Sequence, residues 1–210
     1  MKEVLKIYFS QYTIIFYWLL ALTGLAYSIS SGALVNYWYL SFAIILLSPF
    51  IEYFSHQYFL HFPIPLNKEK FKFLTKYMDN VHYIHHRDPK DVNFIFAQIW
   101  LTLPVLFFDL TAAYLITGSV QMTAVIITSV IFYYLLYEWT HFMAHSNYNP
   151  KNGYSAYMKK YHLLHHYKNE NYWFGITSPI GDHLFGRYKD PDKVEKSPTV
   201  KTLANNVFEI

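Results

Sequence analysis

Histidine is the residue type in this chain whose number and spacing point most directly to chemistry. Ten of the eleven histidines fall in four short groups. The groups are His56 and His61; His82, His85 and His86; His141 and His145; and His162, His165 and His166. The second and fourth groups share the form H-x-x-H-H, and the third is H-x-x-x-H, so each can line one side of a helix. The five-residue spacing of the first group is more typical of a helix end. Imidazole is the commonest metal-binding side chain, and ten imidazoles are enough for two metal ions.

The ligand type alone leaves the metal open. Nitrogen ligands suit zinc, copper, iron and nickel. The chain has no cysteine, which excludes thiolate sites and iron–sulfur clusters. It has no H-E-x-x-H motif, which a zinc protease of that kind requires. A zinc pair would favour hydrolysis, whereas an iron pair would activate dioxygen.

The elements that position these histidines are predicted to cross a membrane. Hydrophobic residues make up 53% of the 210 residues and charged residues only 15%, whereas soluble proteins are about a quarter charged. This composition excludes a disordered chain, and a net charge of +3 gives no sign of nucleic-acid binding. The stretch 7–51 has no charged residue, and the stretch 92–137 has one, Asp109. Each is long enough for two spans. We predict spans at about 10–29, 34–54, 93–114 and 120–140.

The basic residues predict the orientation of these spans. All 17 lysines and arginines lie before the first span, between the second and third, or after the fourth. By the positive-inside rule, both termini and the middle segment are cytoplasmic. We therefore predict a single all-α membrane domain, 1–210, built as a four-helix bundle of two helical hairpins. Its cytosolic helical cap, 56–91 and 141–190, would hold the histidine-rich dimetal centre, and 191–210 would be a polar tail.

The sequence resembles the fatty acid hydroxylase superfamily, which includes sterol desaturases. Three stretches carry the likeness, namely residues 52–62 (EYFSHQYFLHF), residues 137–145 (YEWTHFMAH), and residues 161–166 (YHLLHH) with 174–186 (FGITSPIGDHLFG). The likeness is strongest to the fatty acid 2-hydroxylase branch. Glycine stands at position 181, where that branch commonly has tryptophan.

The resemblance implies a membrane oxidoreductase, a di-iron monooxygenase that hydroxylates a fatty acyl chain with dioxygen. All ten grouped histidines would be metal ligands. The cofactors would be two iron ions, although zinc can occupy the site in purified protein. The partners would be a lipid substrate and a separate electron-donor protein such as a cytochrome b5 or a ferredoxin, since no cytochrome b5 domain precedes the hydroxylase region.

The resemblance also suggests supporting residues. Asp182 would accept a hydrogen bond from a ligand imidazole, and Glu138 is a candidate for the same role. His183 is expected either near the metals or at the surface. A further set could line an acyl entry or simply anchor the protein at the interface: Tyr172, Trp173 and Phe174.

Two other functions remain open at this point. One is a carotenoid or sterol hydroxylase or desaturase of the same superfamily, although the ending at 174–186 favours an acyl substrate. The other is a non-catalytic metal-binding membrane protein, but transporters place polar ligands near the bilayer midplane, and these histidines lie at helix ends. We expect a bacterial cytoplasmic membrane, with the endoplasmic reticulum as the alternative.

Overall fold

The computed structural model describes residues 1–62 and 72–203, and the secondary structure of these residues is helical, with no strand among them. Contacts divide the chain into two compact units. Unit 1 comprises Met1–Ser48 and Ala97–Trp139, and unit 2 comprises Pro49–Phe96 and Thr140–Ile210. The boundary falls inside two long helices, α4 (Trp38–Phe54) and α9 (Val120–His145). The single domain 1–210 stays a prediction.

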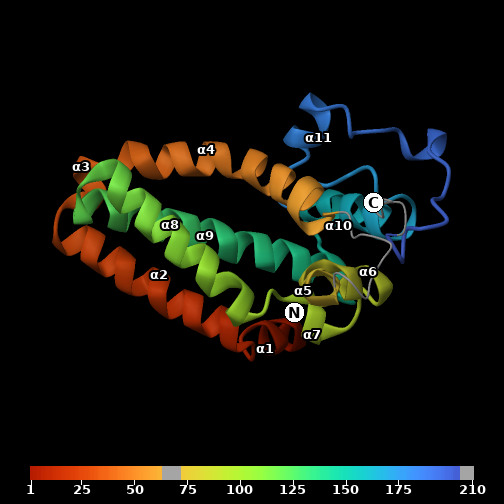
Figure 1. Cartoon of the computed structure of the whole chain (residues 1–210), viewed down its shortest axis with the longest axis horizontal. Helices are drawn as coiled ribbons and strands as arrows, with labels where there is room; N and C mark the ends of the chain where they lie inside the picture. The colour runs from red at the N-terminus through yellow and green to blue at the C-terminus, as the bar shows by residue number, and fades with distance from the viewer. Residues whose placement is uncertain (63–71, 204–210) are drawn as a thin grey trace. The chain divides into compact units, whose positions relative to one another are not determined.

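Unit 1 consists mainly of long apolar helices, joined by two short ones. Besides the first part of α4 and most of α9 it contains α1 (Lys2–Tyr8), α2 (Tyr12–Ser30), α3 (Ala33–Asn36) and α8 (Ile99–Thr117), as Figure 1 shows. Four segments have the length and composition of membrane spans, namely Tyr12–Ser30, Trp38–Leu60, Val92–Thr117 and Val120–His145. The four predicted spans are therefore present, and the chain is built as an integral membrane protein.

The span boundaries depart from the prediction in the second, third and fourth spans. The second span is Trp38–Leu60 instead of 34–54. α8 begins at Ile99 because the backbone at Phe96 and Gln98 is extended, and the short helix α7 (Val92–Ile95) precedes this break. α8 then continues through Pro104 to Thr117. α9 extends five residues beyond the predicted end of the fourth span and stops at His145.

Helices α2 and α9 approach closely in unit 1. A Cβ atom at Gly24 would lie 2.3 Å from the side-chain oxygen of Thr128, so a larger residue there would require the Thr128 hydroxyl to move. Nearer the start of α2, the rings of Tyr17 and Tyr134 lie 4.7 Å apart. Small residues at such crossings let membrane helices pack by van der Waals contact.

Unit 2 contains the short helices that carry most of the histidines. These are η1 (Ser55–Leu60), α5 (Lys72–Met78), η2 (Asp79–Tyr83), α6 (Ile84–Arg87), α7, α10 (Gly153–Tyr167), α11 (Ile180–Leu184) and η3 (Pro191–Lys193). η1 directly continues α4, and η2 continues α5 into α6. The start of α10 is capped by the Asn152 side chain, which accepts a hydrogen bond from the Ser155 amide.

The predicted polar tail is in part a packed element of unit 2. Ser197, Val200 and Leu203 are buried, and the Ser197 amide donates to the Lys168 carbonyl. The polar composition of this stretch concealed the apolar pair at 200 and 203, whose side chains are excluded from water. Residues 63–71 of the predicted cap and 204–210 of the predicted tail lie outside the described residues.

Candidate metal centre

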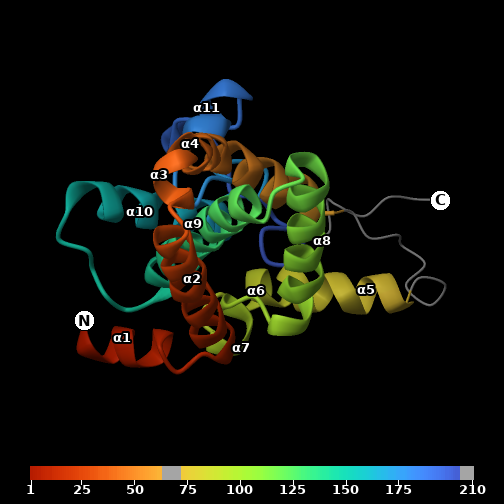
Figure 2. The same ribbon diagram turned by 90° about the vertical axis from the view of Figure 1, so that its left-hand side faces the viewer.

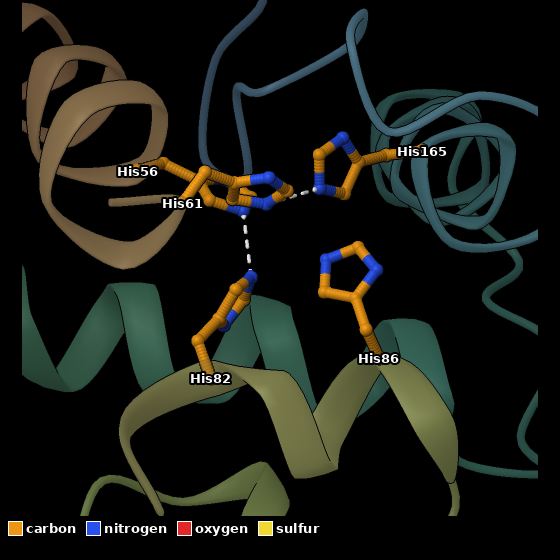
Figure 3. Close-up of side chains that lie close together, drawn as sticks. All are labelled: His56, His61, His82, His86 and His165. Atoms are coloured by element: carbon orange, nitrogen blue, oxygen red, sulfur yellow. Dashed lines mark hydrogen bonds between the residues drawn. The ribbon is translucent and has the colours of Figure 1, made fainter. Parts of the chain in front are cut away.

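The ten grouped histidines converge in unit 2 as two sets of five. Group A comprises His56, His61, His82, His86 and His165. Group B comprises His85, His141, His145, His162 and His166. In each group, one nitrogen of every ring lies within 4.8 Å of one nitrogen of every other, and all ten side chains are buried. Figure 3 shows group A, whose rings come from η1 and the residue that follows it, from η2 and α6, and from α10.

A π-helical turn explains the five-residue spacing of His56 and His61. η1 is wound as a π-helix, and the His61 amide donates to the His56 carbonyl at 3.2 Å. Residues five apart then stand on the same side, because the π-helix repeats its hydrogen bonds from i to i+5. The expectation of a helix end was therefore incomplete, since this local winding brings both rings into group A.

The two H-x-x-H-H motifs each serve both groups. In the first motif His82 and His86 belong to group A while His85 belongs to group B. In the second the assignment is reversed, because His162 and His166 belong to group B and His165 to group A. Each motif thus contributes its i and i+4 rings to one group and its i+3 ring to the other. η2 is a second π-helix, and it includes His82.

The nitrogen separations match those expected around shared metal ions. In group A, the Nε2 atoms of His56 and His82 are 3.2 Å apart, and those of His61 and His165 are 3.1 Å apart. In group B, the His145 Nε2 lies 3.1 Å from that of His85 and 2.9 Å from that of His162. Two imidazoles bound to one ion at about 2.0–2.1 Å would place their nitrogens about 2.9–3.4 Å apart.

Backbone carbonyls orient four of the rings. The Nδ1 atoms of His56, His86, His141 and His165 lie 2.5–3.1 Å from the carbonyl oxygens of Phe174, Val200, Ile95 and Tyr172, respectively. A neutral imidazole that donates from Nδ1 keeps the lone pair of Nε2 available for a metal. These contacts therefore favour the tautomer that a metal ligand needs.

Other ring nitrogens have no hydrogen-bond partner among the described residues. Both nitrogens of His166 are in this state although the side chain is fully buried, as are Nε2 of His86 and Nδ1 of His162. Leaving a buried polar atom unsatisfied costs about 1–3 kcal/mol. A bound ion would satisfy the atoms that face the centre of each group, so the residues present fit a pair of metal ions.

Asp182 supports the site through the backbone. Its carboxylate accepts hydrogen bonds from the amides of Phe174 at 2.9 Å and Gly175 at 2.7 Å. The carbonyl of the same Phe174 is the partner of His56 Nδ1. The expected direct bond to an imidazole is thus replaced by a relay, because the tight backbone turn at 174–175 lies between Asp182 and the ring.

Glu52 is a supporting residue that the sequence prediction did not name. Its buried carboxylate accepts from the amides of Ile176 and Thr177 and from the Thr177 hydroxyl, at 2.5–2.9 Å. It lies one turn before His56 and holds the segment that follows Phe174. The available signal was a carboxylate four residues before a histidine at the end of an apolar span.

The last described segment supports His86 in the same way. Buried Glu170 accepts hydrogen bonds from the hydroxyls of Ser197 at 3.0 Å and Thr199 at 2.7 Å. The Val200 carbonyl, one residue further on, is the partner of His86 Nδ1. Sequence reasoning missed both Glu170 and this contact, because it treated the segment as a tail.

The remaining predicted residues lie in different surroundings. Glu138 accepts a hydrogen bond from the Ala97 amide within unit 1. His183 is exposed, stacks on Tyr188 at 3.9 Å, and belongs to neither group.

The three aromatic residues that follow the last histidine motif have different surroundings. Trp173 is fully buried, against Met158 and Tyr161, and its indole donates to the Lys189 carbonyl. The Phe174 ring lies 5.2–5.5 Å from three rings of group A. Tyr172 contributes the carbonyl that contacts His165. Their role in substrate binding stays a prediction.

Comparison with known proteins agrees with this geometry. The fatty acid hydroxylase family profile matches residues 41–187, which is more than half of the chain. The chain belongs to the fatty acid hydroxylase family. It is 32% identical to the ceramide very long chain fatty acid hydroxylase SCS7 of Saccharomyces cerevisiae, over 68% of this chain and 36% of that protein.

Two further relatives confirm the predicted likeness to the 2-hydroxylase branch. The identity is 26% to mouse fatty acid 2-hydroxylase, over 65% of this chain and 36% of that protein. The identity is 27% to the Arabidopsis thaliana dihydroceramide fatty acyl 2-hydroxylase FAH2, over 65% of this chain and 54% of that protein. The chain therefore spans about a third to a half of the length of these relatives.

A solved structure shares the fold. The structure of full-length scs7p, in which only the hydroxylase domain is visible, superposes with a TM-score of 0.72 and 24% identity. The match covers 86% of this chain and 69% of that one. The predicted fold class, an all-α membrane protein with a histidine-rich centre, is confirmed.

We predict that Asp182→Asn weakens metal binding. The amide oxygen of asparagine can accept from one of the two backbone donors, but its NH2 group would face the other. The turn at Phe174 would then shift and release His56. We expect metal affinity to fall about 10- to 100-fold, as for other losses of a group that orients a ligand, measured by competition with a chelator. Asp192→Asn, at an exposed carboxylate, is the control, and equal affinities for the two variants would contradict the relay.

We also predict that the metal-free protein loses stability in acid. Burial, together with the charge of neighbouring imidazoles, lowers the pKa of seven rings outside the spans, and that of His86 to about 3. The others are His61, His82, His85, His162, His165 and His166.

The direction of this stability change follows from proton uptake. Below the ordinary pKa of about 6.5, the unfolded chain binds protons that the folded chain excludes, so stability is full above that pH and falls as pH drops toward the folded values. Thermal melts of chelator-treated protein between about pH 7.5 and 5 measure this. A melting temperature that rises on acidification would contradict it.

Proposed function

We propose that this protein is a di-iron, dioxygen-dependent hydroxylase of a fatty acyl chain, with the 2-position as the favoured carbon. The observation that carries the proposal is the pair of buried five-histidine groups, in a chain that belongs to the fatty acid hydroxylase family. The printed names of the relatives, which include fatty acid 2-hydroxylases, favour an acyl substrate over a carotenoid or a sterol.

The ten histidines of groups A and B are the proposed ligands. When bound, two iron ions would supply the redox chemistry that activates dioxygen, which zinc cannot supply because it is not redox active. The proposed reaction converts R–H, O2, two electrons and two protons into R–OH and water. One oxygen atom enters the product, and the other leaves as water.

The protein's own residues would keep the site dry and its ligands oriented. All ten rings are shielded from solvent, which limits side reactions with water at the site. The Phe174 ring forms one apolar wall of group A. The carbonyls of Phe174, Val200, Ile95 and Tyr172 fix four ring orientations, so a metal pair would not have to reorganise them.

The cellular setting is also a proposal. The lysines and arginines support cytoplasmic termini and a cytoplasmic cap, and the electrons would come from a carrier protein on that side. The relatives named above are from eukaryotes, so they give no support to the expected bacterial cytoplasmic membrane.

We predict that His165→Ala abolishes hydroxylation, because it removes a ring from the centre of group A. His183→Ala is a matched control, since that histidine is exposed and outside both groups. The measurement is lipid mass spectrometry of a host supplied with 18O2. Cells with the wild-type or His183→Ala protein should contain an acyl lipid that gains one 18O atom, and cells with His165→Ala should not.

Two results would contradict the proposal. One is an acyl lipid that gains no label in the presence of the wild-type protein, which would end the assignment as an oxygenase. The other is labelled lipid that persists with His165→Ala, which would remove this histidine from the ligand set.

A further inference from the structure

A groove of about 430 Å3 lies on the outer face of α10. Its α10 wall includes Ala156, Lys160, Leu163 and Tyr167, and the opposite wall includes Asn149 and Pro150, which follow α9. We call this feature the α10 groove. None of the histidines of groups A and B lines it, so it is separate from the site already described.

Part of the α10 groove lies on the face of the helix opposite the histidines, whereas Lys159, at the groove's edge, lies on the side of His162 and His166. Residues 156, 160, 163 and 167 repeat at intervals of four, three and four, which places them along one face. His162 lies two residues from Lys160, and His165 two residues from Leu163, so each histidine points about 200° away around the helix. One helix, about 10–12 Å across with its side chains, therefore separates this part of the groove from His162 and His165.

This helix is connected to both metal groups. His165 belongs to group A, and His162 and His166 belong to group B. The opposite wall is also close to the site in sequence, because Asn149 follows His145 by four residues. A redox centre held in the α10 groove would thus have a short covalent route, through the α10 backbone, to each group.

The groove is strongly basic. Three lysines line it, and none of its lining residues is acidic. The Lys159 ammonium donates to the carbonyls of Met143, Ser146 and Tyr148, at 3.1, 2.5 and 2.9 Å. These contacts fix its charge at the end of α9, where carbonyls lack helical partners.

Further charged residues lie in or near the α10 groove. Lys168 donates to the Pro191 carbonyl, and Lys160 is exposed. Partial burial lowers the pKa of Lys159, and the charge of Lys90 lowers it further, so Lys90 adds to the positive potential. One carboxylate opposes it, because Asp88 is close enough to raise the pKa of Tyr167 after the effect of burial.

We propose that the α10 groove is the docking site of an acidic one-electron carrier protein. The groove is lined by two leucines, a tyrosine and three lysines, and positive charge beside apolar surface suits an acidic partner, whose approach it would steer. The proposal rests on the proposed function, whose reaction needs two electrons from outside. Each docking event would oxidise one carrier by one electron, so two events would serve one turnover.

Charge variants of the full-length, metal-loaded protein in lipid nanodiscs test this proposal. The probes are the soluble haem domain of cytochrome b5 and a plant-type [2Fe–2S] ferredoxin, both acidic one-electron carriers. Their association with the nanodiscs is followed by surface plasmon resonance, which does not depend on turnover. We expect Lys160→Glu to lower the association rate about tenfold for at least one carrier, because charge steering acts mainly on encounter.

Two variants serve as comparisons. Lys76→Glu makes the same change on exposed α5, which Figure 2 shows well apart from α10, and should leave association unchanged. Asp88→Asn removes the opposing carboxylate and should raise the rate. At about 0.5 M salt, where screening is strong, the three variants should converge.

Several results would overturn the proposal. These are equal rates for Lys160→Glu and wild type, equal slowing by Lys76→Glu, or failure of both carriers to bind the wild-type protein. If Lys160→Glu changes the association rate only in nanodiscs that contain phosphatidylglycerol, the groove would be assigned to anionic lipid instead. Wild-type protein that places no 18O in any acyl lipid of its host would contradict the proposed function and leave the docking measurement standing.

Discussion

The burial of ten imidazoles around two points is the constraint on which the rest of the structure depends. Each ring must be neutral to stay out of water, and each must turn one nitrogen toward its group. Nitrogens that face one another at 2.9–3.2 Å can share one proton in pairs, whereas an ion placed between them would satisfy several nitrogens of a group at once. The folded arrangement is therefore one that a metal pair completes, and the surrounding elements can be understood as means of holding the rings in place before the metals bind.

Two kinds of support hold these rings. The first is helix winding, because the π-helix η1 brings His56 and His61 to one side. The second is a set of buried carboxylates that act through the backbone. Glu52 and Asp182 hold the segment around Phe174, and Glu170 holds the segment before Val200. The carbonyls of Phe174 and Val200 then orient His56 and His86, so part of the site depends on residues far from it in sequence.

Much of this was predictable from the sequence, because long charge-free stretches and clustered histidines are strong signals. The four spans and the set of ten histidines needed only composition and spacing. The division into two groups was not predictable, because it depends on how His85 and His165 point relative to their neighbours within each motif. The π-turn was equally hidden, since a five-residue spacing also suits a helix end. The role of 197–203 was missed because two buried apolar residues carry little weight in a polar stretch.

The most direct test of the account is the metal content and spectrum of protein expressed in 57Fe-enriched medium and purified without oxygen. The account predicts two iron ions per chain, with Mössbauer parameters typical of nitrogen and oxygen ligation and no sulfur. One iron ion per chain, or none in a protein that still hydroxylates lipid, would contradict the central claim that the two histidine groups bind one metal ion each.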